Sequence, residues 1–185
     1  MWKRILDFYK YKLLSFFKPE IIGNPRRFIK NTGMNVGISN TTHISNNGNN
    51  LKIGNNVFIG HFNYIDAFNE TIEIGDNVQI TNYTNILTHS THNSIRFYLN
   101  HLSSEEIKEI NNVSPVKIGR NSYIGPHTVI MPGTIIGENV IIGAYSFVKG
   151  EIADNSIVRG IPAKTIGSTQ KIDAILLGKF QLKKK

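Results

Sequence analysis

The stretch from Ile118 to Gly150 determines the fold, and read six residues at a time it is IGRNSY, IGPHTV, IMPGTI, IGENVI, IGAYSF and VKG. An aliphatic residue opens every unit: Ile118, Ile124, Ile130, Ile136, Ile142 and Val148. Glycine follows this residue in four of the units. A period of six matches neither the roughly 3.6-residue period of an amphipathic helix nor the alternation of a long strand, so each unit predicts a very short strand and a bend.

Such a unit is too small to bury its own aliphatic side chain. Stacked units place each aliphatic residue above the last and build a continuous internal column. Three sides of six residues close one coil, so the residues alone predict a β-solenoid shaped as a three-sided prism.

The same period occurs earlier in the chain, at Ile53, Ile59 and Ile65, and again at Ile74, Ile80 and Ile86. Between these two groups the six-residue spacing is interrupted over Asp66 to Glu73, which predicts a small loop. The segment from Gly33 to Asn50 predicts irregular first coils.

After Ile86 the repeat breaks until Ile118, which predicts an inserted loop over about residues 88–116. A long insertion in a compact repeat fold is typically functional or disordered. Ser103 and Glu106 have the spacing of a capping box, so the sequence predicts an ordered short helix within the insertion.

The two ends differ in character from the solenoid. Residues 1–32 are expected to form an N-terminal helix over 1–17 and a connector, residues 33–167 the solenoid, and residues 168–185 a C-terminal helix with a basic tail. The N-terminal segment combines aromatic and basic residues. It is expected to pack over the open end of the solenoid or against a neighbouring subunit. The alternative is an amphipathic helix that rests on a membrane surface, where the intact protein is expected to bind at most weakly.

Composition excludes several classes of protein. The 185 residues are 40% hydrophobic, carry a net charge of +8 and include no cysteine. Disulfides, thiolate metal sites and a cysteine nucleophile are therefore excluded. The positive charge favours anionic partners such as phosphate-bearing cofactors, while the lack of a groove-reading motif argues against nucleic acid. No apolar run reaches a membrane-spanning length and no signal peptide pattern is present, so we expect a cytoplasmic location, possible also at the inner face of the membrane.

Together with a segment GIPAK at Gly160 to Lys164, the hexads resemble the hexapeptide-repeat acyltransferase family over about residues 30–167. The resemblance is to the branch of sugar and surface-polysaccharide O-acetyltransferases. It implies an all-β fold, a left-handed parallel β-helix, and it implies a homotrimer with active sites between subunits and acetyl-CoA as acyl donor.

The resemblance also implies a histidine general base just beyond the coil at Ile86. The segment there is THSTHN, and matching His92 to the family position requires a one-residue insertion, so His89 is the second choice. A neutral imidazole suits the task because acyl transfer to an alcohol needs a base with a pKa near 7.

Matching the family register gives the positions expected to contact the cofactor: Pro126, Ala144, Lys149, Gly150, Gly160, Pro162 and Lys164. Small Ala144 allows a close approach of the pantetheine arm, and Lys164 can meet a phosphate. The alternative for Lys164 is a basic residue that only closes the solenoid.

The segment after Ile59 resembles the part of related enzymes that carries acceptor-binding polar groups. His61, Asn63 and Asp66 are therefore expected to contact sugar hydroxyls, although Asn and Asp also belong at turns for backbone reasons alone.

The function predicted from these features is acetyl-CoA-dependent O-acetylation of a sugar hydroxyl, in capsule, lipopolysaccharide or exopolysaccharide biosynthesis. N-acetylation of an amino sugar or antibiotic is the nearest alternative. No metal site is expected: a γ-class carbonic anhydrase needs histidines from adjacent coils at metal distance, and the six histidines lack that spacing. A noncatalytic solenoid would not require the insertion or the GIPAK segment.

Overall fold

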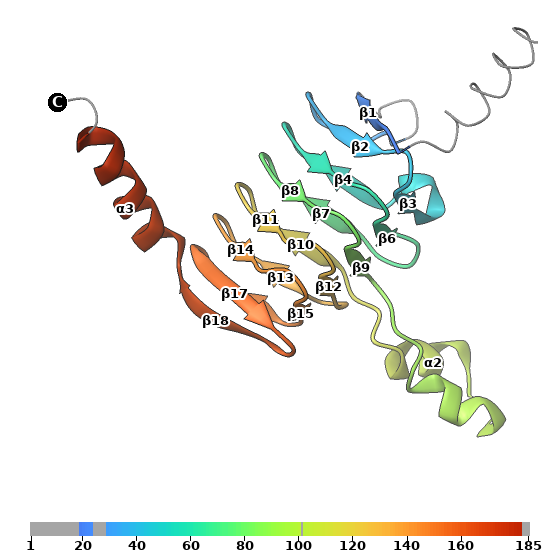
Figure 1. Cartoon of the computed structure of the whole chain (residues 1–185). Helices are drawn as coiled ribbons and strands as arrows, with labels where there is room; N and C mark the ends of the chain where they lie inside the picture. Colours follow the sequence, from blue (N-terminus) through green and yellow to red (C-terminus); the bar gives the residue numbers. More distant parts are fainter. Residues whose placement is uncertain (1–18, 24–28, 101, 183–185) are drawn as a thin grey trace, which may run out of the picture.

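The computed structural model describes residues 19–23, 29–100 and 102–182 of the chain. They form a three-sided prism of stacked coils, from which one inserted loop and a C-terminal helix project (Figure 1). The predicted helix over residues 1–17 lies outside the described residues.

Each side of the prism is one sheet, and the chain visits the sheets in the order A, C, B in every coil. Face A contains β1 (Ile21–Gly23), β2 (Gly37–Ser39), β5 (Phe58–Ile59), β8 (Gln79–Ile80), β11 (Tyr123–Ile124), β14 (Ile141–Ile142), β17 (Ser156–Gly160) and β18 (Ala163–Ser168). Face B contains β4 (Leu51–Ile53), β7 (Ile72–Ile74), β10 (Val116–Ile118), β13 (Ile135–Ile136) and β16 (Glu151–Ile152). Face C contains β3 (His43–Ile44), β6 (Tyr64–Asp66), β9 (Asn85–Leu87), β12 (Val129–Ile130) and β15 (Phe147–Val148).

The strands of successive coils pair in parallel and in register, so equivalent aliphatic residues lie directly above one another. On face A the column runs through Ile38, Ile59, Ile80, Ile124, Ile142 and Val158. All members of this column are buried. Because burial of an aliphatic side chain stabilises the fold by about 1.5–3 kcal/mol, the three columns supply most of the favourable free energy of folding. The predicted six-residue period is confirmed.

Face A ends differently from the other two faces. At its first edge β1 pairs antiparallel with β2, and at its last edge β18 pairs antiparallel with β17. The GIPAK segment therefore forms a hairpin that ends the parallel stack.

The glycine that follows the aliphatic residue permits the close approach of neighbouring coils. A Cβ atom added at Gly119 would lie 2.4 Å from the Gly137 carbonyl oxygen. At Gly137 it would lie 2.3 Å from an Asp154 carboxylate oxygen. Neighbouring strands in a sheet are only about 4.8 Å apart, so a side chain at these corners meets the next coil directly.

The corner between faces B and A is built by asparagine in every coil. Asn35, Asn56, Asn77, Asn121, Asn139 and Asn155 all have a left-handed backbone, with φ between 54° and 59°. Each side-chain amide donates to the amide oxygen of the next asparagine at 3.0–3.2 Å. Asparagine tolerates this backbone better than most residues, so one residue type supplies both the turn and a hydrogen-bonded ladder.

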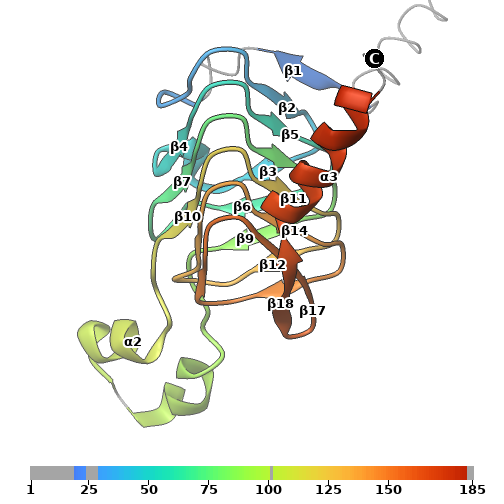
Figure 2. The same cartoon turned by 90° about the vertical axis from the view of Figure 1, so that its left-hand side faces the viewer.

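The insertion leaves the corner between faces C and B, between β9 and β10 (Figure 2). It contains a 3₁₀ helix (Ser94–Asn100) and α2 (Ser104–Ile110). The predicted capping box is confirmed: the Glu106 backbone N–H donates to Ser103 Oγ at 3.2 Å, and the Ser103 N–H donates to Glu106 Oε2 at 2.8 Å. These bonds with Ser103 lower the pKa of the Glu106 carboxyl.

The C-terminal helix α3 (Thr169–Leu182) projects from the end of β18, away from the prism (Figure 1). Its aliphatic side chains Ile172, Ile175, Leu176 and Leu177 are exposed. No helix in the described part of the chain is long and apolar enough to span a membrane.

The glycine geometry predicts that Gly119→Ala destabilises the fold. The added methyl group must displace a backbone carbonyl, at a cost of about 1–3 kcal/mol, which corresponds to a fall of roughly 2–10 °C in Tm. Thermal unfolding followed by circular dichroism measures this. The matched control is Gly178→Ala in α3, where a Cβ meets nothing within 4 Å. Equal Tm values for Gly119→Ala and the parent would contradict the conclusion that a side chain at this corner meets the next coil.

Candidate functional site

The corner between faces C and B carries two open grooves, one on each side of the stem of the insertion. The His89 groove has a volume of about 440 Å³ and is lined by Ser45, Tyr64, Asp66, Phe68, Asn69, His89, Thr91, Asn111 and Val113. The His92 groove has a volume of about 450 Å³ and is lined by His92, Asn93, Glu109, Ile110, Asn112, Pro132, Gly133, Lys149 and Gly150. The insertion therefore places one of the two candidate bases in each groove.

His89 is paired with a buried carboxylate. Its Nδ1 atom lies 2.5 Å from Asp66 Oδ2, and the Asp66 side chain is 1% exposed whereas that of His89 is 35% exposed. Asp66 ends strand β6 and His89 follows strand β9, so the pair joins two successive coils. When Nδ1 carries the proton and donates it to the carboxylate, Nε2 is left as an acceptor.

The other contacts of Asp66 fix its carboxylate in place. Oδ1 accepts from Ser45 Oγ at 3.3 Å, and Oδ2 accepts from the Thr88 backbone N–H at 3.4 Å. The Thr88 hydroxyl donates to the Asp66 carbonyl at 2.6 Å. Asp66 was expected to contact sugar hydroxyls, but its burial and these bonds direct its carboxylate to His89 and the coil.

His92 has a different environment. Its Nδ1 atom lies 2.6 Å from Ser90 Oγ, in an exposed part of the insertion. Its backbone carbonyl accepts from Arg96 at 2.8 Å. No carboxylate pairs with His92 in the described residues. Of the two candidates, only His89 has a buried group that orients its ring.

The remaining predicted acceptor residues lie at another corner, between faces A and C. Asn63 is buried, its amide donates to the Gly60 carbonyl at 3.0 Å, and its Oδ1 accepts from the Thr84 N–H at 2.7 Å. His61 Nδ1 lies 2.6 Å from Ser39 Oγ. These contacts serve the turn, and the structure does not bring His61 or Asn63 together with His89.

The predicted cofactor residues are distributed over three places. Pro126 and Ala144 follow the face A strands β11 and β14, at the corner between faces A and C. Lys149 and Gly150 line the His92 groove. Gly160, Pro162 and Lys164 belong to the β17–β18 hairpin.

The hairpin adds a residue that the sequence reasoning missed. Arg159 on β17 is directly opposite Lys164 on β18, and both are exposed. Directly opposed residues of an antiparallel pair project to the same side, and like charges in that position are destabilising. Neither cation has an ion pair within the described residues. The sequence signal for Arg159 is its position directly before the GIPAK segment.

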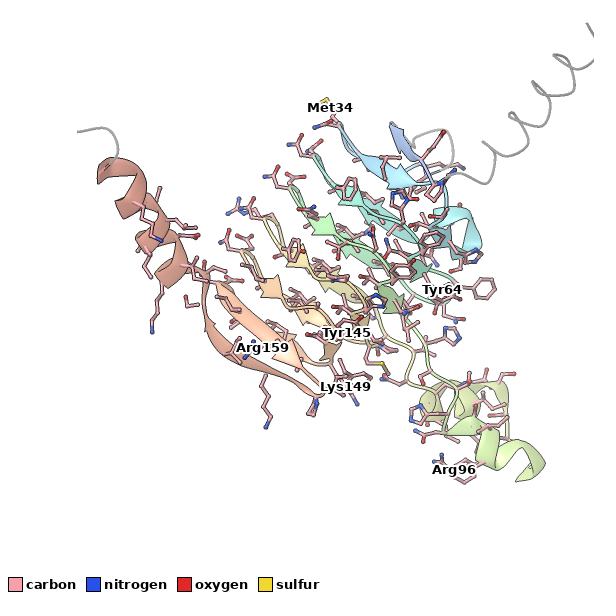
Figure 3. All side chains as sticks on the ribbon, viewed as in Figure 1. Met34, Tyr64, Arg96, Tyr145, Lys149 and Arg159 are labelled. Atoms are coloured by element: carbon pink, nitrogen blue, oxygen red, sulfur yellow. The ribbon has the colours of Figure 1, made fainter. Side chains whose placement is uncertain are left out.

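Figure 3 shows that Arg159, Lys149 and Tyr145 all lie at the end of the prism formed by the last coils. Tyr145 is the last ring of an exposed stack that also contains Phe62, Tyr83 and His127, with centroids 4.6–5.2 Å apart. Among the described residues there is no cluster of three His, Cys, Asp or Glu side chains that could hold a metal ion.

Comparison with known proteins identifies the repeat. Residues 115–150 match the family described as bacterial transferase hexapeptide (six repeats). These coils carry the hexapeptide repeat of bacterial transferases. The predicted resemblance to hexapeptide-repeat acyltransferases is confirmed, and with it the fold class, a left-handed parallel β-helix.

Two curated relatives are similar over part of the chain, and both are proteins of Escherichia coli (strain K12). A protein named for O-acetyl transfer in lipopolysaccharide biosynthesis is 43% identical over 53 residues, which cover 29% of this chain and 27% of that protein. Galactoside O-acetyltransferase is 38% identical over 98 residues, which cover 52% of this chain and 43% of that enzyme. The hexapeptide-repeat chain thus spans less than half the length of each relative.

A similar solved structure is a hexapeptide-repeat-containing acetyltransferase from Vibrio cholerae O1 biovar eltor complexed with acetyl coenzyme A. It has a TM-score of 0.66 and 25% identity, and the match covers 77% of this chain and 73% of that one.

Proposed function

We propose that this hexapeptide-repeat protein is an acetyl-CoA-dependent O-acetyltransferase that acts on a sugar hydroxyl during assembly of a surface polysaccharide. The observation that carries the proposal is the His89–Asp66 pair, which holds an oriented imidazole in an open groove beside the insertion. The relatives named for O-acetylation of galactosides and for lipopolysaccharide biosynthesis support the choice of a sugar hydroxyl.

The chemistry follows from the geometry of the pair. Nε2 of His89 takes the proton of the acceptor hydroxyl while the oxygen attacks the thioester carbonyl carbon. The tetrahedral intermediate collapses by breaking its C–S bond, and the departing sulfur of coenzyme A receives the proton from His89. The Asp66 carboxylate keeps the proton-bearing Nδ1 turned inward and stabilises the imidazolium that forms between the two steps.

This mechanism assigns the base to His89 and changes the order of the two sequence candidates. A buried carboxylate is a better partner for a transient imidazolium than the Ser90 hydroxyl next to His92, because a full negative charge of low solvent exposure stabilises the cation directly. We place His92 beside the donor, since its groove also contains Lys149 and Gly150.

The donor site is supported by uncompensated positive charge. Coenzyme A carries phosphate groups, and Arg159 and Lys164 form a pair of like charges that an anion would neutralise. The Vibrio cholerae structure with acetyl coenzyme A supports the same donor.

We also propose that the active site forms between copies of the chain, in the homotrimer implied by the resemblance. Pro126 and Ala144 lie at the corner between faces A and C, whereas His89 lies at the corner between faces C and B. Face C separates these positions within one prism. Two prisms packed side by side bring one corner of each to a shared groove.

The proposed base predicts that His89→Ala lowers kcat by roughly 10²–10⁴-fold, the loss typical for removal of a positioned base. Thiol release from acetyl-CoA in the presence of methyl β-D-galactopyranoside and related glycosides provides the assay. The matched variant is His92→Ala, which should keep most of the kcat.

Asp66→Asn should reduce kcat while leaving the KM for acetyl-CoA unchanged, because it removes the charge that orients His89 and stabilises its imidazolium. Circular dichroism serves as the folding control for these variants. A fully active His89→Ala together with an inactive His92→Ala would return the base to His92.

The donor site predicts that Lys164→Ala and Arg159→Ala each raise the KM for acetyl-CoA. A charge-assisted contact to phosphate contributes about 1.5–3 kcal/mol, which corresponds to roughly a ten- to hundredfold change. Thermal stability should stay equal or rise, since the change removes repulsion between opposed cations.

The control for the donor site is Lys117→Ala, which removes an exposed lysine of face B. Comparison of acetyl-CoA with acetyl-dephospho-CoA tests which phosphate is bound. Equal KM values for all variants and the parent would contradict the assignment of this hairpin to the donor.

A further inference from the structure

The His89 groove contains two aromatic rings that have no packing role in the core. Phe68 is 61% exposed and Tyr64 is 37% exposed, and both line the wall of the groove that holds His89. Exposed aromatic side chains beside a proposed catalytic base indicate a surface for a ligand.

Phe68 reaches this position because the six-residue spacing of the repeat is interrupted after β6. The corner between β6 and β7 spans residues 67–71, and Phe68 stands in it. At the equivalent corner two coils later, between β12 and β13, the residues 131–134 are Met, Pro, Gly and Thr. The irregular corner therefore adds an aromatic ring at the one place where the groove contains the His89–Asp66 pair.

Tyr64 is held by the neighbouring coil. It lies outward on strand β6, and its ring stacks on His43 of β3, with centroids 5.4 Å apart and an angle of 2° between the planes. Figure 3 shows Tyr64 on the flank from which the insertion leaves. A ring fixed in this way presents its surface without a large loss of side-chain entropy on binding.

Apart from Val113, the rest of the lining is polar, and Asp66 is the only carboxylate among these residues. Ser45, Asn69, Thr91 and Asn111 supply hydroxyl and amide groups, and the described residues that line the groove include neither lysine nor arginine. Asn111 Oδ1 is buried and has no hydrogen-bond partner within the described residues, so a donor from a ligand or solvent would satisfy it. The cations suited to phosphate lie elsewhere, at Lys149 in the other groove and at Arg159 and Lys164 in the hairpin.

We propose that Phe68 and Tyr64 form an aromatic platform for a neutral pyranose ring of the acceptor, with Asn69 and Asn111 as partners for its hydroxyls. A pyranose has an apolar C–H face and a rim of hydroxyls, and an aromatic ring beside neutral amides matches both parts. The groove volume of about 440 Å³ falls within the range of small-molecule sites. The absence of lysine and arginine among the described lining residues disfavours an acidic sugar or a sugar phosphate at this position. The assignment of this ring as the acceptor rests on the proposed function.

The experiment compares Phe68→Ala, Phe68→Leu and Phe68→Trp in the chain of 185 residues. Methyl β-D-galactopyranoside, methyl β-D-glucopyranoside and methyl α-D-mannopyranoside are the neutral acceptors, and methyl β-D-glucuronide is the acidic one. We expect Phe68→Ala and Phe68→Leu to raise the KM for the best neutral glycoside at least about tenfold, and Phe68→Trp to retain a KM near that of the parent. The KM for acetyl-CoA and the slow hydrolysis of acetyl-CoA by water should not change. Phe58→Ala, which removes a phenylalanine from face A, is the matched control.

An unchanged KM for every glycoside in Phe68→Ala and Phe68→Leu would overturn the platform, as would a preference for the glucuronide. Equal effects on the KM for acetyl-CoA would assign Phe68 to the donor instead and equally overturn it. Saturation-transfer NMR with the same glycosides separates this inference from the proposed function, because it detects binding without turnover. A transfer signal to the pyranose C–H protons that disappears in Phe68→Ala supports the platform even if no acetyl transfer occurs, and a signal equal to that of the parent refutes it.

Discussion

The fold depends on the spacing of neighbouring coils, which is set by backbone hydrogen bonds between parallel strands. At about 4.8 Å this spacing admits an aliphatic side chain inside the prism and nothing larger than hydrogen at several corner positions. An aliphatic residue followed by glycine meets both requirements, because the aliphatic side chain fills the interior and the glycine leaves room for the next coil. Ile118 with Gly119 and Ile136 with Gly137 are examples. The asparagine ladder meets a third demand, a left-handed turn at every passage from face B to face A.

The same constraint leaves one corner free to vary. Passages from face C to face B range from short turns to the insertion between β9 and β10, and strand register on either side stays intact. The two grooves, the His89–Asp66 pair and the exposed ring of Phe68 all occur at this corner. The rigid coils thus position groups that irregular segments supply. The pair illustrates this division, since Asp66 ends strand β6 and His89 lies beyond strand β9, at the start of the insertion.

The sequence predicted the solenoid, the location of the insertion and its capped helix because each depends on local spacing. It ranked His92 ahead of His89 because spacing alone does not show which ring lies beside a carboxylate of the neighbouring coil. It also assigned Asp66 to substrate binding. The burial of this carboxylate depends on contacts with the preceding coil and with Thr88, and sequence spacing does not show these contacts. Arg159 was missed for a related reason: its opposition to Lys164 exists only once β17 and β18 pair antiparallel.

The antiparallel strands at the two edges of face A affect how the molecule behaves in a crowded solution. A stack of parallel coils has no natural end, and a bare terminal coil would offer its unpaired backbone groups to the first coil of another molecule. β1 and β18 reverse the chain direction at these edges, so another prism cannot continue the parallel ladder of face A in register. The edge strands of face A therefore also oppose the end-to-end growth of filaments through this face.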